Sequence, residues 1–222
     1  MRTAACQKDF GMRHAGRKEK NMKDRIFDKF NAKNMAMGIT GLLLVGFGSG
    51  MLVKTGYGAD TLNAIFTGVA RLTGLSVGTV SAIVNGIMLV FIFFVQRELV
   101  GIGMFLSVLV LKFPIDFAIA VYPASPNLAV GVCSDILSFV VFCLGVALMM
   151  ESELGVTGYD GLTLIATNKS KKPFRTVRLI CDGITLGLAF LLKGEIGVGT
   201  VLGFLLMAPF IDFFRKRIEK VL

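Results

Sequence analysis

Long apolar runs without a charged residue constrain this chain more than any other feature. Residues 35–53 form one such run of 19 residues, and residues 77–95 form another, which contains Asn85. At 1.5 Å per residue, a helix needs about 20 residues to cross a bilayer core of about 30 Å. Only 18% of the residues are charged, against about 25% in soluble domains. The sequence therefore predicts an all-α, polytopic transmembrane helical bundle.

Two apolar segments are too short to cross a bilayer. The first begins at Asp60 and runs for about 14 residues, or roughly 21 Å as a helix; the second begins at Asp160 and is shorter still. We expect both to be half-helices that enter the membrane without crossing it. Four more runs complete a prediction of about six spans: residues 100–121, 128–150, 177–192 and 196–214.

The two halves of the chain match at several points in the same order. The matched pairs, at offsets of 96 to 100 residues, are Asp60 with Asp160, Thr79 with Thr176, Asn85 with Asp182, Gly101 with Gly197, and Ile115 with Ile211. This order predicts an internal duplication, with repeat 1 at residues 35–121 and repeat 2 at residues 128–214. If the two short segments are half-helices, each repeat has three spans and the repeats are inverted relative to each other. If the short segments cross the membrane, each repeat has four spans and the repeats are parallel. Segment length favours the inverted arrangement.

Both ends of the chain are basic. Residues 1–34 hold ten Lys or Arg against four acidic residues, and residues 215–222 open with Arg215, Lys216 and Arg217. Because Lys and Arg concentrate on the cytoplasmic side of membrane proteins, we expect both tails to be cytoplasmic and the protein to be multi-pass in a bacterial cytoplasmic membrane. The net charge of +9 is then a property of membrane flanks, and no nucleic-acid partner is expected.

Glycine-rich turns precede the two short segments. Gly58 lies two residues before Asp60, and Gly158 lies two residues before Asp160. Each aspartate could cap its half-helix, because a carboxylate accepts backbone N–H groups at a helix N-terminus. Each could also bind a cation, a coupled proton or a substrate amine. The two roles are compatible, and the sequence leaves both open.

Polar side chains also fall inside the predicted spans. Asn85 and Asp182 lie well inside their apolar runs, where a polar group is costly and therefore a candidate functional residue. Arg178 precedes Asp182 by four residues, so the two can pair on one helix face. Asp116 lies near a span end, where capping is the simpler role.

The sequence offers no basis for an enzyme. His14 is the single histidine, and Cys6, Cys133, Cys143 and Cys181 form no C-x-x-C pair. We find no triad-like constellation, no phosphate loop and no metal-ligand spacing, so no catalytic residue, cofactor or metal is expected.

The paired motifs resemble those of a known family. The closer half reads Gly155-Val-Thr-Gly158-Tyr-Asp160-Gly-Leu, followed by Thr176-Val-Arg178. Twice in this chain, a glycine-rich turn ending in Asp-x-Leu is followed by a short helix and by a span closed by Gly-[Ile/Val]-Gly. This repeated pattern resembles the YczE/YyaS/YitT-type bacterial integral membrane proteins. The lack of a soluble domain after the last span is more similar to the YczE branch. The resemblance implies a membrane location and this fold, and hints at transport.

Two functions follow as hypotheses. A small-solute or ion transporter would have a polar cavity between the repeats, lined by Asp60, Asp160, Asn85 and Asp182. A non-transporting interaction partner or scaffold would instead present a broad small-residue or apolar face. The expected partners are the lipid bilayer, an unknown small solute or ion and a second copy of the chain in a homo-oligomer. The Gly46-x-x-x-Gly50 face allows close helix packing, but glycine is common in membrane helices, so this face does not by itself predict dimerisation.

Overall fold

The chain folds into a bundle of α-helices. The computed structural model describes residues 32–57, 60–97, 102–123, 128–152 and 156–220, and these contain no β-strand. The helices are α3 (Ala32–Thr55), α4 (Thr61–Thr73), α5 (Val77–Val95), α6 (Ile102–Val110), α7 (Lys112–Val121), α8 (Leu128–Glu151), α9 (Gly158–Ser170), α10 (Phe174–Leu191) and α11 (Val198–Glu219). The predicted all-α class is confirmed. The N-terminal tail of residues 1–31 and Gly58 lie outside the described residues.

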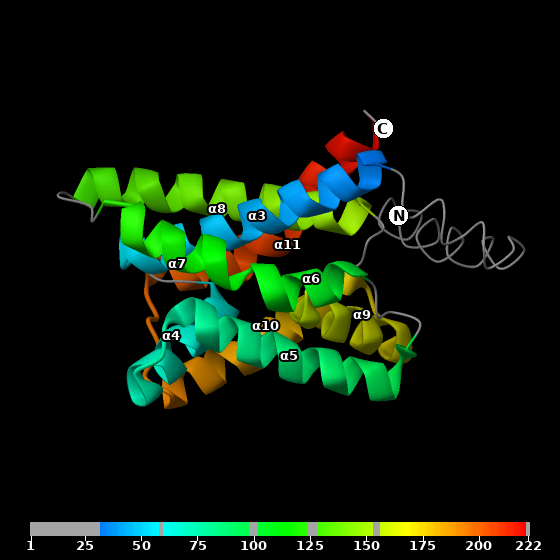
Figure 1. Cartoon of the computed structure of the whole chain (residues 1–222), viewed down its shortest axis with the longest axis horizontal. Helices are drawn as coiled ribbons and strands as arrows, with labels where there is room; N and C mark the ends of the chain where they lie inside the picture. The colour runs from blue at the N-terminus through cyan, green and yellow to red at the C-terminus, as the bar shows by residue number, and fades with distance from the viewer. Residues whose placement is uncertain (1–31, 58–59, 98–101, 124–127, 153–155, 221–222) are drawn as a thin grey trace, which may run out of the picture.

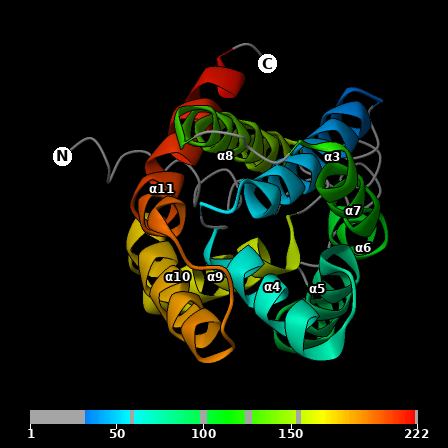
Figure 2. The same ribbon diagram turned by 90° about the vertical axis from the view of Figure 1, so that its left-hand side faces the viewer.

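The helices form two layers joined along one side. Helices α3, α8 and α11 lie together in one layer, and α4, α5, α9 and α10 lie in the other, while α6 and α7 close one flank (Figure 1). The end-on view in Figure 2 shows these helices around an interior into which α4 and α9 project. Helix α3 packs along α8 and α7, α4 packs against α10, and α9 packs against α5.

Glycines bring α3 close to its neighbours. A Cβ on Gly145 of α8 would lie 2.6 Å from the backbone nitrogen of Val45, and one on Gly50 would lie 2.5 Å from the carbonyl oxygen of Ile115 in α7. A Cβ on Gly46 would lie 2.4 Å from the ring of Pro114. The Gly46-x-x-x-Gly50 face is therefore used within the chain, against α7, and is not free to dimerise.

The outer surface of the bundle is apolar enough to face lipid. Phe94, Phe190 and Leu191 are each 76% exposed, far beyond the scattered apolar exposure of soluble proteins. Within the described residues, four helical stretches are long and apolar enough to cross a membrane: Ala32–Thr55, Val77–Val95, Gly103–Val121 and Ala129–Glu151. Helices α10 and α11 are not in this group, and α10 carries Arg178 and Asp182. Six spans therefore remain a prediction.

The two short segments fold as short helices. Helices α4 and α9 each have 13 residues, or roughly 20 Å, so the second is as long as the first and not shorter as expected. Helix α4 ends at the predicted break, where Gly74 takes a left-handed conformation (φ 72°) that glycine adopts without strain. The two helices lie toward opposite ends of the bundle (Figure 1).

The third predicted span is one helical stretch with an interruption in its hydrogen-bond ladder. Residues 102–121 form α6 and α7, which are separated at Leu111. Pro114 follows three residues later and has no N–H to donate to the carbonyl of Val110, so the hydrogen-bond ladder is interrupted there. In the middle of α7, Asp116 accepts hydrogen bonds from the backbone N–H of Gly78 (2.9 Å) and the hydroxyl of Ser76 (2.8 Å). Asp116 thus holds the start of α5, a capping role.

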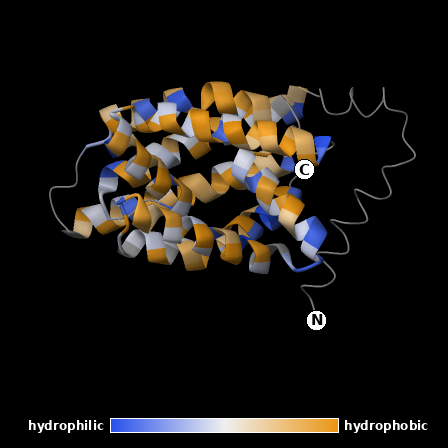
Figure 3. Cartoon of the chain, turned by 90° about the horizontal axis from the view of Figure 1, so that it is seen from below, coloured by the Kyte–Doolittle hydropathy of each residue, from blue (hydrophilic) through white to orange (hydrophobic). Residues whose placement is uncertain are grey.

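Hydrophobic residues predominate along the helices, and hydrophilic residues are more frequent toward the two ends of the bundle (Figure 3). Helix α3 begins at one end, and α5, α8, α9 and α11 finish there (Figure 1). The basic residues in or beside those helix termini are Lys33, Arg97, Lys169, Lys171, Lys172, Arg215, Lys216, Arg217 and Lys220. The opposite termini carry Lys54, Arg71 and Lys193, and Lys112 lies against the start of α5. One end is therefore far more basic than the other.

Candidate functional site

A buried cluster of charged side chains lies where α4, α9 and α10 approach one another. Its centre is Arg178 of α10, which is 3% exposed. Arg178 donates from Nη1 to Asp160 of α9 and from Nε to Asp182, one turn along α10, at 3.3 Å. Asp160 and Asp182 are 4% and 3% exposed. Such charges are tolerated away from water only when they are paired and hydrogen-bonded.

Asp182 also connects the two short helices. The hydroxyl of Tyr159, in the first turn of α9, donates to Oδ1 of Asp182 at 2.5 Å. The hydroxyl of Thr61, the first residue of α4, approaches the same oxygen at 3.4 Å. The guanidinium of Arg178 lies over the Tyr159 ring, 4.8 Å from its centroid. Thr61 and Tyr159, which are almost 100 positions apart in the sequence, therefore share one carboxylate.

Asp160 is not the N-cap of α9, which was one of the two roles that the sequence left open for it. The N-cap is Thr157, whose hydroxyl oxygen accepts the backbone N–H of Asp160 at 3.4 Å. The same hydroxyl donates to Oδ2 of Asp160 at 2.8 Å. Because Thr157 meets the capping requirement, the carboxylate of Asp160 is available for its ion pair with Arg178.

Asp60 occupies the N-cap position of α4, but its side chain makes no capping hydrogen bond. Its carboxylate instead accepts a hydrogen bond from the side-chain amide of Asn63, one turn along the same helix. The Asn63 amide also donates to the hydroxyl oxygen of Ser49 in α3, at 2.8 Å. Asp60 is 6% exposed and has no ion pair among the described residues.

Asn85 of α5 reaches the cluster from the opposite side. Its side-chain amide donates to the carbonyl oxygen of Ser81 at 2.9 Å and approaches the Ser81 hydroxyl at 3.3 Å. Its Oδ1 faces the start of α9, since a Cβ on Gly158 would lie only 3.1 Å from it. In the described structure, Oδ1 of Asn85 and Oδ1 of Asn63 are buried and accept no hydrogen bond. Such unpaired buried acceptors are rare in native proteins and call for an explanation.

A small cavity of about 40 Å³ lies inside this cluster. Its wall includes Asp60, Asp160, Asn63, Asn85 and Arg178. Pockets for organic ligands usually measure 300–1,000 Å³, whereas one water molecule occupies about 30 Å³ of liquid. The cavity therefore has room for an ion or a few water molecules, and an organic ligand would require the helices to move.

The structure brings most of the predicted site residues together. Asp60, Asp160, Asn85 and Arg178 line the cavity, Asp182 lies behind Arg178, and Gly158 packs against Asn85. The transporter hypothesis predicts a polar cavity lined by Asp60, Asp160, Asn85 and Asp182, and a dry interior in which all four were capped or paired would contradict it. Asp160 and Asp182 are paired with Arg178, but Asp60 has no ion pair among the described residues and Oδ1 of Asn85 accepts no hydrogen bond there.

Sequence reasoning missed several members of the cluster. Ser49, Asn63, Ser81, Thr157 and Tyr159 all line the cavity and were not singled out. A signal existed for Asn63, which lies three residues after Asp60 and therefore on the same helix face. No such local signal existed for Ser49, because small polar residues are common in membrane helices.

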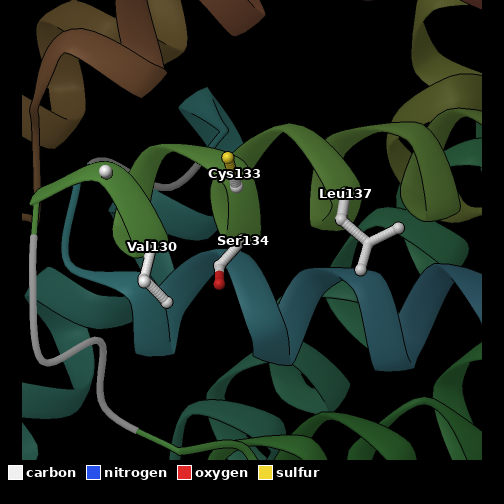
Figure 4. Close-up of a pocket in the computed structure, with 5 residues that line it drawn as sticks. Val130, Cys133, Ser134 and Leu137 are labelled. Atoms are coloured by element: carbon white, nitrogen blue, oxygen red, sulfur yellow. The ribbon is translucent and has the colours of Figure 1, made fainter.

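A second hollow, of about 350 Å³, has a different character. It is lined by Ala129, Val130, Cys133, Ser134 and Leu137. All five belong to α8, and they lie along one stretch of that helix (Figure 4). Because a single helix lines it and Val130 is 47% exposed, it is an open hollow on the outer surface and is unconnected with the charged cluster.

The apolar spans and the buried charged cluster define this chain as a helical integral membrane protein. The comparison with known families agrees: the model described as "Family of unknown function (DUF6198)" matches residues 32–216. The chain belongs to this family.

The chain is also similar to individual bacterial proteins. It is 27% identical to "Uncharacterized protein YyaS" of Bacillus subtilis (strain 168), over 85% of this chain and 94% of that protein. It is 25% identical to "Uncharacterized membrane protein YczE" of the same organism, over 78% of this chain and 81% of the relative. An "Uncharacterized protein" of Haemophilus influenzae is 24% identical. These relatives confirm the resemblance to YczE and YyaS. No solved structure gives a significant match.

Proposed function

We propose that this protein is a transporter of a small solute or ion, with its site between two inverted repeats. The observation that carries the proposal is the meeting of two short helices at one buried charged cluster beside a cavity. Residues that begin both helices, Thr61 and Tyr159, contact the same carboxylate of Asp182. Helices that break near the bilayer midplane are tolerated only around a protein-lined or wet cavity, and transporters use them to bind substrates and coupling ions.

The packing of the helices supports a duplication. Helix α4 packs against α10, which follows α9 in the chain, and α9 packs against α5, which follows α4. Each short helix therefore contacts the long helix that comes directly after the short helix of the other half. Asn85 and Asp182 both lie eight residues after the first residue of their helices, Val77 and Phe174. An inverted pair of repeats places its two half-helices toward opposite membrane faces, in agreement with their positions at opposite ends of the bundle (Figure 1).

The charge distribution supports an orientation. The end at which α3 begins and α11 finishes holds most of the described Lys and Arg residues. We assign this end to the cytoplasm, because cytoplasmic loops are enriched in Lys and Arg. Both chain termini are then cytoplasmic, and Lys54, Arg71 and Lys193 lie near the outer face. This arrangement has six spans and two half-helices.

Flux through reconstituted protein tests the proposal. A panel of small organic cations, anions and neutral solutes is first screened for compounds that raise the melting temperature of the purified chain, since a specific ligand stabilises by RT ln(1 + [L]/Kd). Uptake of each positive compound is then measured in proteoliposomes. We expect saturable uptake by the wild type and its loss in Asp160→Asn, with Asp135→Asn as the control. Asp135 is a carboxylate of α8 that accepts a hydrogen bond from Thr55 (2.9 Å), outside the cluster.

The scaffold hypothesis makes a different prediction. It predicts a broad small-residue or apolar face for a partner and no polar cavity between the repeats. Gly46, Gly50 and Gly145 are occupied by contacts within the chain, so such a partner would have to use the apolar outer surface. Folded protein in vesicles that moved no compound of the panel and no alkali cation would contradict the transporter proposal.

A further inference from the structure

We propose that the cavity beside Asp60 binds one alkali-metal cation, held by the Asp60 carboxylate and the side-chain carbonyl oxygens of Asn63 and Asn85. The three residues come from α4 and α5 and line the same cavity. The inference rests on the proposed function, since it names the charge and class of one ligand of that site. Neither the family nor the named relatives assign such a ligand.

The charge of the cluster calls for a cation. Asp60, Asp160 and Asp182 carry three negative charges when ionised, whereas Arg178 carries one positive charge. Each of the N-termini of α4 and α9 contributes about half a positive charge. The cluster therefore keeps about one negative charge in excess. Arg178 pairs with Asp160 and Asp182, so this excess resides on Asp60, which has no ion pair among the described residues.

The unpaired oxygens show where the cation would bind. Asn63 and Asn85 are 2% and 3% exposed, and each uses its amide nitrogen in hydrogen bonds to serine oxygens. Their carbonyl oxygens are left without a hydrogen bond in the described structure, beside the carboxylate with the excess charge. A buried acceptor without a partner costs about 1–3 kcal/mol, and coordination of a cation by both oxygens would remove that cost.

The composition of the site favours a monovalent ion. One free carboxylate with neutral carbonyl and hydroxyl oxygens neutralises a single positive charge, whereas calcium and magnesium sites usually use several carboxylates or bound phosphates. The described residues contain no group of three or more His, Cys, Asp or Glu arranged to hold a metal ion. The cavity of about 40 Å³ also suits a dehydrated alkali cation better than an organic ammonium ion.

The thermal stability of the purified full chain tests the inference. The melting temperature is measured in detergent while NaCl, KCl or LiCl replaces choline chloride at constant ionic strength. We expect at least one alkali cation to raise it in a saturable manner, by roughly 5–10 °C at a hundred times Kd. Asp60→Asn should abolish the response, and Asn85→Leu should raise the concentration needed for half the effect by about tenfold. The control Asp135→Asn should respond like the wild type.

Several outcomes would overturn the inference. The inference is wrong if none of the three cations changes the melting temperature of the wild type. It is also wrong if the melting temperature of Asp60→Asn responds as strongly as that of the wild type. A melting temperature that depends on pH but not on alkali cations would identify a proton site instead. Cation-dependent stability without flux of any compound would support the cation site and contradict the transporter proposal. Solute flux without a response of the melting temperature to cations would support the transporter proposal and contradict the cation site.

Discussion

Removal of the guanidinium of Arg178 tests whether the buried cluster is an ion-pair network. Arg178→Gln would leave Asp160 and Asp182 buried without the counter-charge that contacts both of them. Breaking one buried ion pair costs about 3–5 kcal/mol, because the remaining charge stays in a poorly solvating interior. For a chain of this size, about 2–4 °C of melting temperature correspond to 1 kcal/mol, so we expect a fall of roughly 6–20 °C.

The matched control is an exposed arginine in an ion pair. Arg71 pairs with Glu195 at 2.6 Å, but its side chain is 60% exposed. Exposed pairs contribute about 0–1 kcal/mol, so Arg71→Gln should lower the melting temperature by no more than about 4 °C. The second control is a rescue. Asp160→Asn and Asp182→Asn, added to Arg178→Gln, remove the unpaired charges, so most of the lost stability should return.

A buried thiol provides the assay. The chain has no tryptophan, so its intrinsic fluorescence is weak. Cys143 is fully buried in the core between α3 and α8, and a thiol-reactive fluorescent dye will reach it only after unfolding. Replacement of Cys6, Cys133 and Cys181 leaves Cys143 as the single reporter.

Two results would refute the reasoning. If Arg178→Gln melted within about 4 °C of the wild type, the cluster would be solvated and the carboxylates would not depend on Arg178. If the triple variant stayed as unstable as Arg178→Gln, the loss would come from packing of the arginine side chain and not from unpaired charge.

Three further predictions concern the packing and the orientation of the bundle. Gly145→Ala should lower the free energy of unfolding by about 1–3 kcal/mol, because the new Cβ would lie 2.6 Å from the backbone of α3. Its control is Gly187→Ala on the exposed side of α10, where nothing lies within 4 Å of the new Cβ, so this variant should be neutral or stabilising. Equal melting temperatures for the two variants would contradict the close α3–α8 contact. Gly74→Ala should cost about 1–2 kcal/mol at the left-handed end of α4, and an unchanged melting temperature would argue against that conformation. In intact cells, a membrane-impermeant maleimide should label Lys193→Cys but not Lys216→Cys, and the reverse pattern would invert the orientation.

The sequence predicted several features of the bundle that depend on local pattern. The span at Val77–Val95 coincides with α5, and the short segment after Asp60 coincides with α4. Hydrophobic length and glycine breaks are local properties, so they can be read without a tertiary structure. The break between α6 and α7 could have been predicted from Pro114, which sequence reasoning passed over.

The site was only partly accessible to the same reasoning. The pair between Arg178 and Asp182 was predicted because residues four apart share a helix face. The ion pair between Arg178 and Asp160 was not predicted, because it depends on whether the turn between α9 and α10 lets these two helices pack against each other. Capping of α9 was one of two roles left open for Asp160, but Thr157 takes that role and leaves the carboxylate for the ion pair.

By itself, the sequence determined that this chain must be helical and embedded in a membrane, because apolar runs of this length must satisfy their backbone groups internally. It also predicted that a short helix starts near each of Asp60 and Asp160. Only the tertiary structure decided that Thr61 and Tyr159, at the starts of those helices, meet at one carboxylate, and that Asp60 is left without a counter-charge. Helix packing places residues about 100 positions apart at one depth in the bundle, and no local pattern specifies that depth.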